Sequence, residues 1–256
     1  MELDQLTQPV FYITHLYPEA MNIYGDMGNI LAMQYRLRAL GIRPVYQPVP
    51  LGKDLPSKTD WYFMGGGQDA EQSEVIKDLA YKKKRLFGDV SQGIGLLAIC
   101  GGYQLLGQRF LTGQGELIPG LGLFEVETRA PGPGVKARCI GNLVTKCNIE
   151  GLEDEYLVGF ENHSGQTSLL PGAKDQGGYA LGRVVSGQGN TLGGEDEGYV
   201  LGGAVGTYLH GSCLPKNPHL AQWFVDKALE RKGLKGLASR VDDTIARAVN
   251  VQLSRK

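Results

Sequence analysis

The stretch that decides the fold is Gly95-Leu-Leu-Ala-Ile-Cys100-Gly-Gly-Tyr-Gln-Leu-Leu-Gly107. Its first five residues predict a short buried strand, and the residues from Tyr103 to Phe110 are expected to begin the next helix. Cys100 stands between the two, followed by a pair of glycines that permit a sharp turn. This order predicts a nucleophile elbow that lifts the Cys100 thiol above the end of its strand. The alternative is a small buried hydrophobe, as free cysteines usually are, but the glycines favour catalysis.

Strand and helix signals alternate on the N-terminal side of this elbow. Strands are predicted at 10–13, 43–46 and 61–64, and helices at 28–40 and 71–87. Such alternation is typical of a parallel sheet that is covered by helices on both faces. The sequence therefore predicts an α/β fold with a mostly parallel central sheet flanked by helices.

The C-terminal side of the chain has a different character. From residue 121 to residue 209, short β-type runs are separated by glycine and proline, which predicts added antiparallel strands appended to the sheet as hairpins. Two helices, at 217–232 and 238–253, are expected to close the chain. We find no internal repeat and no convincing linker, so we expect a single domain over residues 1–256.

Composition and charge argue against several classes of function. The 256 residues carry a net charge of -1 that is spread along the chain, which gives no electrostatic case for nucleic acid. No apolar run approaches the roughly 20 residues of a membrane span, and the N-terminus lacks the pattern of a signal peptide. The 4 cysteines are too few and scattered for a disulfide scaffold. We therefore expect a cytoplasmic protein without membrane insertion.

A cysteine nucleophile needs a histidine, and the chain has 4. His210 follows the strand-like run 205–209, and His163 follows the run 159–162, so each would be delivered into a turn at a strand end. His15 is expected in a loop after the first strand, and His219 at a solvated helix start. His163 and His210 are therefore the two candidates, although either one alone would be interpreted as structural.

Acyl transfer also requires hydrogen-bond donors for the developing oxyanion. Three glycines, Gly65 to Gly67, end the strand predicted at 61–64 and offer backbone N–H groups at the same edge of the sheet. We expect Gly66 to be one donor. The N–H of Gly101 is expected to be the second, from the geometry of the elbow.

Four motifs together resemble the class I glutamine amidotransferases, and within them the branch related to cobyric acid synthase. They are Gly-Gly-Gly-Gln-Asp at 65–69, Ile-Cys-Gly-Gly-Tyr-Gln at 99–104, Phe-Glu-Asn-His at 160–163 and Gly-Thr-Tyr-Leu-His-Gly at 206–211. The resemblance runs almost end to end and implies the flavodoxin-like fold of that class. Weaker strings, at 22–29 and 214–217, resemble the GatD-type glutaminase subunits.

The resemblance implies roles for these residues. Cys100 would attack the carboxamide of L-glutamine, and His210 would protonate the departing ammonia and then activate water against the thioester. GatD-type subunits form a heterodimer with MurT, a Mur-ligase-like synthetase subunit that amidates D-glutamate of lipid II in peptidoglycan synthesis. This chain has no phosphate-binding Gly-x-x-x-x-Gly-Lys-Ser/Thr loop, so any ATP-driven step must occur elsewhere. No cofactor or metal is expected in this chain. ATP and Mg are expected on the partner ligase.

Three residues are predicted to bind glutamine. Arg138 matches the position where GatD-type proteins hold the substrate carboxylate, a bidentate task that suits a guanidinium. The segment 131–134 resembles an insertion, so Arg129 is a competing candidate. Gln104 and His163 are the other predicted contacts, with purely structural roles as the alternative.

One position departs from the pattern of the class. Its members commonly carry a carboxylate two residues after the histidine, and Ser212 stands there in this chain. Asp26 and Glu161 are alternatives within the chain. The GatD resemblance favours a carboxylate from the partner subunit, which would leave the lone chain a poor glutaminase.

Competing interpretations have weaker support. Gly65-x-Gly67-x-x-Ala70 matches a dinucleotide fingerprint, but a basic run at 81–85 stands where an acidic strand end is needed about 20 residues on. His210, Cys213, Cys139 and Cys147 have irregular spacing for a zinc site. The functional alternatives are a glutaminase of corrinoid amidation, a stand-alone cysteine amidohydrolase and a binding subunit without catalysis.

Overall fold

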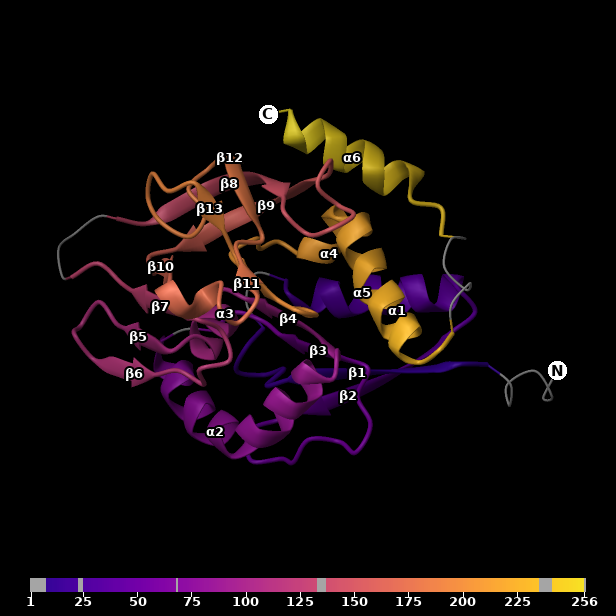
Figure 1. Cartoon of the computed structure of the whole chain (residues 1–256), viewed down its shortest axis with the longest axis horizontal. Coiled ribbons are helices and arrows are strands. Elements are labelled where there is room, and N and C mark those ends of the chain that lie inside the picture. Colours follow the sequence, from indigo (N-terminus) through magenta and orange to yellow (C-terminus); the bar gives the residue numbers. More distant parts are fainter. Residues whose placement is uncertain (1–7, 23–24, 68, 133–136, 235–240, 256) are drawn as a thin grey trace.

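The computed structural model describes residues 8–22, 25–67, 69–132, 137–234 and 241–255 (Figure 1). Its main sheet has seven strands in the order β11-β14-β15-β4-β3-β1-β2. Their bounds, in that order, are Gly178–Tyr179, Tyr199–Leu201, Ala204–Thr207, Gly95–Ile99, Trp61–Met64, Val10–Leu16 and Arg43–Val49. The five strands from β15 to β2 pair in parallel, while β14 and β11 pair antiparallel at one edge. The mostly parallel central sheet is confirmed.

Helices cover both faces of the main sheet. In Figure 1, α1 (Met27–Ala39) and α5 (Pro218–Arg231) lie together on one side, and α2 (Asp69–Ser91) lies on the other. Every residue of β3 and β4 is buried, which explains why the sequences of both strands are continuous apolar runs. The remaining helices are α3 (Gly101–Leu106), α4 (Cys213–Lys216), α6 (Thr244–Ser254) and the single turn η1 (Pro171–Ala173).

Most of the predicted antiparallel strands form two further sheets instead of extending the main one. The second sheet has the order β10-β7-β5-β6, with bounds Gln166–Leu169, Val126–Arg129, Arg109–Leu111 and Leu117–Pro119. The third has the order β13-β12-β8-β9, with bounds Asp196–Glu197, Gly182–Ser186, Cys139–Cys147 and Tyr156–His163. The prediction of hairpins appended to the main sheet was therefore right only for β14 and β11.

Two local predictions need correction. The helix expected over 103–110 is α3, which ends at Leu106, and Phe110 belongs to β5. The chain leaves the helix at Gly107, where a Cβ would stand 2.9 Å from the Val126 carbonyl oxygen, so the backbone is already packed against the second sheet. His15 lies inside β1 and is fully buried, not in a loop after it. The closing helix expected at 238–253 is observed only from Thr244 onward, as α6, since residues 241–243 are not helical; residues 238–240 lie outside the described residues.

The parallel strands end along one edge of the main sheet. Leu16 pairs with Met64, Met64 with Ala98, and Thr207 with Ile99, so four strand ends lie in register there. Ligands bind at the carboxyl edge of open α/β sheets because the loops that leave these strands converge on it. The loops that carry Asp26, Gly66, Cys100 and His210 all leave from this edge. In the part of the chain that is described, no helix is long and apolar enough to cross a membrane.

Candidate active site

Cys100 forms the elbow that the sequence predicts, between β4 and α3. Its backbone has φ 49° and ψ −106°, a strained conformation for a residue with a Cβ. The glycines after it allow close contact with the 65–67 segment. A Cβ on Gly102 would stand 2.8 Å from the Gly65 carbonyl oxygen, and one on Gly101 would stand 2.9 Å from the Gly67 nitrogen. The thiol is therefore fixed at the strand end by packing that tolerates no side chain behind it.

His210 follows β15 and lies beside Cys100. Its backbone is held by two hydrogen bonds to Phe160 in β9: the His210 N–H donates at 2.8 Å and the His210 carbonyl accepts at 3.2 Å. Burial lowers the pKa of the imidazole, but the nearby Cys100 and Asp26 outweigh burial and raise this pKa to about 9. The protonated ring is thus favoured in a buried site where a negative charge on Cys100 needs a counterion.

Asp26 lies at the start of α1 and faces His210. Its Oδ1 is 3.8 Å from His210 Nδ1, and the two side chains are 0% and 1% exposed. Its Oδ2 accepts the Gly66 N–H at 2.8 Å. Of the two in-chain carboxylates that the sequence suggests, the structure places Asp26 against His210.

Ser212 occupies the position where the sequence lacks the expected carboxylate. Its backbone is left-handed, with φ 55°, and its hydroxyl donates to the Gly25 carbonyl at 2.6 Å. Gly28 packs against the same side chain, since a Cβ there would stand 2.1 Å from Ser212 Oγ. Ser212 therefore ties the loop after His210 to the loop that carries Asp26.

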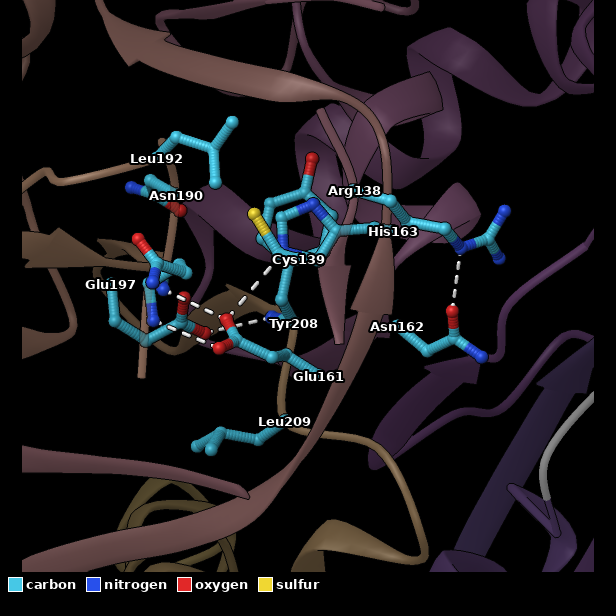
Figure 2. A network of polar contacts seen from close by, with 12 residues as sticks. Arg138, Cys139, Glu161, Asn162, His163, Asn190, Leu192, Glu197, Tyr208 and Leu209 are labelled. Carbon is cyan, nitrogen blue, oxygen red and sulfur yellow. Dashed lines mark hydrogen bonds and ion pairs between the residues drawn. The ribbon is translucent and has the colours of Figure 1, made fainter. Parts of the chain in front are cut away.

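Glu161, the other suggested carboxylate, faces His163 instead (Figure 2). His163 Nε2 lies 3.8 Å from Glu161 Oε2, and the two oxygens of Glu161 accept the backbone N–H groups of Gln188 and Gly189 at 2.8 and 2.9 Å. His163 Nδ1 donates to the Gly165 carbonyl at 2.8 Å. Burial lowers the pKa of His163, but Cys139, Glu161 and Cys100 together raise it to about 10.

Tyr208 connects the predicted glutamine contacts to one another. Its ring stacks on His163 with centroids 3.6 Å apart and an interplanar angle of 11°. Its hydroxyl accepts from Gln104 Nε2 at 3.2 Å and lies 2.6 Å from Thr167 Oγ1. Gln104 and His163 are thus enclosed and bonded to protein groups, which favours the structural alternative; their contact with glutamine stays a prediction. Sequence reasoning missed Tyr208, whose only signal was its place in the motif at 206–211.

The two candidate arginines lie in different surroundings. Arg138 immediately precedes β8, and its Nε donates to Asn162 Oδ1 at 2.8 Å, beside the Phe-Glu-Asn-His motif (Figure 2). Arg129 lies in the second sheet, where its Nε is 2.9 Å from Glu127 Oε1. The position of Arg138 favours it over Arg129 as the residue that binds the substrate carboxylate, which remains a prediction.

The two predicted oxyanion donors also lie in different surroundings. Gly101 follows Cys100 directly, as the elbow requires, and its role stays a prediction. The Gly66 N–H is already donated to Asp26 Oδ2, so it would serve an oxyanion only after leaving that carboxylate. Gly67 also packs against the elbow, because its nitrogen would stand 2.9 Å from a Cβ on Gly101.

The competing site interpretations do not match the structure. Residues 81–85 lie inside α2, so no strand follows the 65–67 segment at the distance that a dinucleotide site needs. Among the described residues, the group of metal-type ligands that comes together is Cys139, Glu161 and His163, not the zinc set suggested by the spacing. Both oxygens of Glu161 already accept backbone hydrogen bonds. His219, expected to be solvated, is 3% exposed, and burial lowers its pKa to about 4.

Comparison with known proteins agrees with this geometry. The CobB/CobQ-like glutamine amidotransferase domain matches residues 12–218. This chain belongs to that family. The enzyme class that the four motifs imply, a glutamine amidotransferase, is thereby confirmed.

Several family members are similar over most of this amidotransferase. It is 34% identical over 232 residues to the lipid II isoglutaminyl synthase (glutamine-hydrolyzing) subunit GatD of Staphylococcus aureus, covering 90% of this chain and 89% of the relative. Against the Streptococcus pneumoniae GatD the identity is 39% over 221 residues, covering 86% and 81%. A probable cobyric acid synthase of Methanothermobacter thermautotrophicus is 32% identical over 192 residues, covering 71% of this chain and 36% of the relative.

Solved structures share the fold of this amidotransferase. A glutamine amidotransferase from Thermotoga maritima has a TM-score of 0.50 and 17% identity, covering 96% of this chain and 90% of that chain. The glutaminase domain of a Trypanosoma brucei CTPS, with bound acivicin, has a TM-score of 0.54 and 9% identity, covering 86% and 94%. These structures confirm the class I glutamine amidotransferase fold.

Proposed function

We propose that this chain is the glutaminase subunit of a two-subunit lipid II isoglutaminyl synthase. The observation that carries the proposal is the strained Cys100 elbow with His210 beside it, in a chain 34% identical to one GatD over 232 residues and 39% identical to another over 221. The partner would be a MurT-like, ATP-dependent Mur ligase that amidates the D-glutamate of lipid II. ATP and Mg would be bound by that ligase and not by this chain.

The proposed reaction has two halves on Cys100. The thiolate attacks the carboxamide carbon of glutamine, and the Gly101 N–H stabilises the oxyanion that forms. His210 donates its proton to the nitrogen as the C–N bond breaks, so ammonia leaves and a thioester remains. His210 then takes a proton from water, which attacks the thioester and releases glutamate and the thiolate. The sum is glutamine and water to glutamate and ammonia.

Arg138 supports the choice of an amino acid as substrate. Its guanidinium is exposed next to Asn162 and is suited to bind the α-carboxylate by two parallel hydrogen bonds. That contact would place the side-chain amide of the substrate at a fixed distance from the anchored end. A longer or a shorter amide would then miss the thiol.

The test measures glutamate release, ammonia transfer and labelling of Cys100. The purified chain is incubated with glutamine alone and then with the Mur-ligase-like protein of the same genome, ATP and lipid II. We expect glutamate release that rises with the partner, and conversion of lipid II to its amidated form by mass spectrometry. Diazo-oxo-norleucine should label Cys100 and abolish both. Absence of glutamate release in both mixtures, or release without ammonia transfer, would contradict the proposal.

A second acceptor has one observation in its favour. Cobyric acid synthases are similar to this chain at 32% identity, yet it covers only 36% of the relative from Methanothermobacter thermautotrophicus. The same assay with a corrinoid carboxylate and its ligase would distinguish the two acceptors, because only the matching ligase would consume the ammonia.

A further inference from the structure

Thr207, the last residue of β15, makes three hydrogen bonds at the point where the strand ends. Its carbonyl accepts the Cys100 N–H at 2.9 Å. Its hydroxyl donates to Glu197 Oε1 at 2.5 Å and accepts the Leu209 N–H at 3.1 Å. Thr207 therefore connects the backbone of the nucleophile to the residue that immediately precedes His210.

Glu197, in β13, is the buried acceptor for this strand end. The residue is 0% exposed, and its Oε1 also accepts the Tyr208 N–H at 2.7 Å (Figure 2). Burial raises the pKa of Glu197, while the bonds from Thr207 and Tyr208 lower it. A carboxylate is costly to bury unless it is hydrogen-bonded, so these two donors hold it against the strand end.

Asn190 holds both neighbours of Glu197 in the chain. Its backbone N–H donates to the Asp196 carbonyl at 2.9 Å, and its side chain exchanges two hydrogen bonds with Gly198, at 2.8 and 3.0 Å. Asn190 is itself buried, and its carbonyl accepts the Thr167 N–H at 2.8 Å. The backbone of Glu197 is therefore fixed by contacts outside β15, and its carboxylate is a fixed point against which the end of β15 is placed.

We propose that Thr207 and Glu197 are positioning residues that set the separation of the nucleophile from His210. This role rests on the proposed glutaminase function and deepens it. Thr207 acts through the N–H groups of Cys100 and Leu209, and Glu197 acts through Thr207 and the backbone that follows it. Neither of these Glu197 bonds goes to the imidazole, so the role does not depend on which carboxylate completes the site at His210.

Both reacting side chains depend on the backbone that Thr207 holds. Cys100 has φ 49°, and such a conformation persists only where the surrounding contacts enforce it, of which the Thr207 carbonyl supplies one. The backbone of His210 pairs with Phe160 on its other side. Without the Thr207 hydroxyl, two of the bonds that shape the turn to His210 are lost. A displacement of about 1 Å between reacting groups can lower a rate about 100-fold.

Thr207→Val is the first variant, because valine has a similar shape and no hydroxyl. Glutamate release is measured with the synthetase partner present. We expect kcat to fall about 10- to 100-fold and KM to stay within about threefold. T207S keeps the hydroxyl and should keep kcat within about threefold of the wild type. T145V is the matched control: Thr145 is buried in β8 and its hydroxyl has no hydrogen-bond partner among the described residues, so kcat should not change.

Two variants of Glu197 separate geometry from charge. E197Q keeps the length of the side chain and an oxygen that can accept both donors, but it removes the charge. E197D keeps the charge and shortens the side chain by one methylene, so its oxygen no longer reaches both donors. We expect E197Q to keep kcat within about threefold and E197D to lose about tenfold. If T207V does not fold, this pair still tests the proposal, because the reverse result would contradict it.

The reactivity of Cys100 gives a readout that needs no glutamine. Alkylation by iodoacetamide is followed against pH, and peptide mass spectrometry distinguishes Cys100 from the other cysteines. Protonated His210 lies beside Cys100 and stabilises the thiolate, so displacing the imidazole should raise the pH midpoint of alkylation. We expect a rise of roughly 0.5 to 1 pH unit in T207V and E197D, and the wild-type midpoint in T207S, E197Q and T145V.

The failures of the two proposals are distinguishable. A midpoint that rises in T207V and not in T207S supports the positioning role even if no glutamate release is found. A folded T207V or E197D with wild-type kcat and an unchanged midpoint overturns it. Equal losses of kcat in T207S and T207V also overturn it, because the hydroxyl would then not be the group that holds the strand end.

Discussion

Two histidine–carboxylate pairs lie close to Cys100, and they differ in what else contacts the ring. In each pair the nitrogen and the oxygen are 3.8 Å apart and both side chains are almost fully buried. His163, in the third sheet, is stacked on Tyr208 and bonded through Nδ1 to the Gly165 carbonyl. His210, at the edge of the main sheet, faces Asp26 through Nδ1, and its backbone pairs with Phe160.

The difference favours a structural role for the His163 pair and a catalytic role for the His210 pair. The His163 ring, fixed by stacking and by one hydrogen bond, has little room to turn, and each oxygen of its carboxylate already accepts a backbone N–H group. The His210 ring lies against both Cys100 and Asp26, an arrangement suited to moving a proton between Cys100 and a leaving group while one nitrogen keeps its carboxylate. The equal nitrogen–oxygen distances therefore do not imply equal roles for the two histidines, because the other contacts of each ring differ.

The largest expected effect comes from replacing each histidine in turn. H210A should lower kcat roughly 10³- to 10⁴-fold with little change in stability, because it removes the general acid and base. H163A should keep activity within about tenfold but lower the free energy of unfolding by roughly 2–4 kcal/mol, because it leaves a cavity beneath Tyr208. Steady-state glutamate release and urea unfolding measure the two effects. An H163A enzyme that is fully stable but inactive would contradict the structural role expected for His163.

Stability should depend on pH through both pairs. Each folded-state pKa is raised, to about 9 for His210 and about 10 for His163, while an unfolded histidine titrates near 6.5. Their contribution is therefore fully present below about pH 6.5 and is lost as pH rises to about 9 and 10, because the folded chain holds protons that the unfolded chain has released. The linkage amounts to roughly 3 kcal/mol for His210 and roughly 5 kcal/mol for His163.

Unfolding measured between pH 6 and 10 tests this linkage. The pH-dependent part of the free energy of unfolding should be smaller in H210Q than in the wild type, and smaller again in the double variant with H163Q. Groups that titrate alike in the wild type and in H210Q cancel in the difference between the two proteins. A stability difference between wild type and H210Q that does not change with pH would contradict the raised pKa.

The third sheet is expected to contribute to substrate binding through Arg138 and not through His163. R138A should raise KM for glutamine about 10- to 100-fold with a smaller change in kcat, because the anchor for the carboxylate is lost. R129A is the matched control, since Arg129 pairs with Glu127 in the second sheet, and it should leave KM within about twofold. If R129A raised KM and R138A did not, Arg129 and not Arg138 would be the residue that binds the substrate carboxylate.

The smallest expected effect concerns the backbone behind the elbow. G102A would place a Cβ 2.8 Å from the Gly65 carbonyl oxygen and should cost roughly 1–3 kcal/mol of stability and some activity. G88A in α2 meets nothing within 4 Å and should instead stabilise by about 1 kcal/mol. Thermal unfolding of both variants distinguishes steric contact from a general effect of losing a glycine.

Much of the site followed from local patterns in the sequence. The elbow, the strand ends and the candidate histidines were predicted because each depends on a few neighbouring residues, whereas Arg138 was predicted from the resemblance to GatD-type subunits. The end of α3 at Leu106 was not predicted, because packing of Gly107 against Val126 decides it. The burial of His219 was missed for the same reason: a polar helix start gives no local sign of what will cover it.

The sequence by itself determined the α/β fold, the Cys100 elbow and the family. Periodicity and glycine placement encode the fold and the elbow, and both act over a few residues, while the four motifs carry the resemblance to the family. Only the tertiary structure decided which histidine meets which carboxylate and that the Gly66 N–H is donated to Asp26. Asp26 and His210 leave different strands and are distant in the chain, so their contact depends on strand order and loop packing, which no local pattern contains.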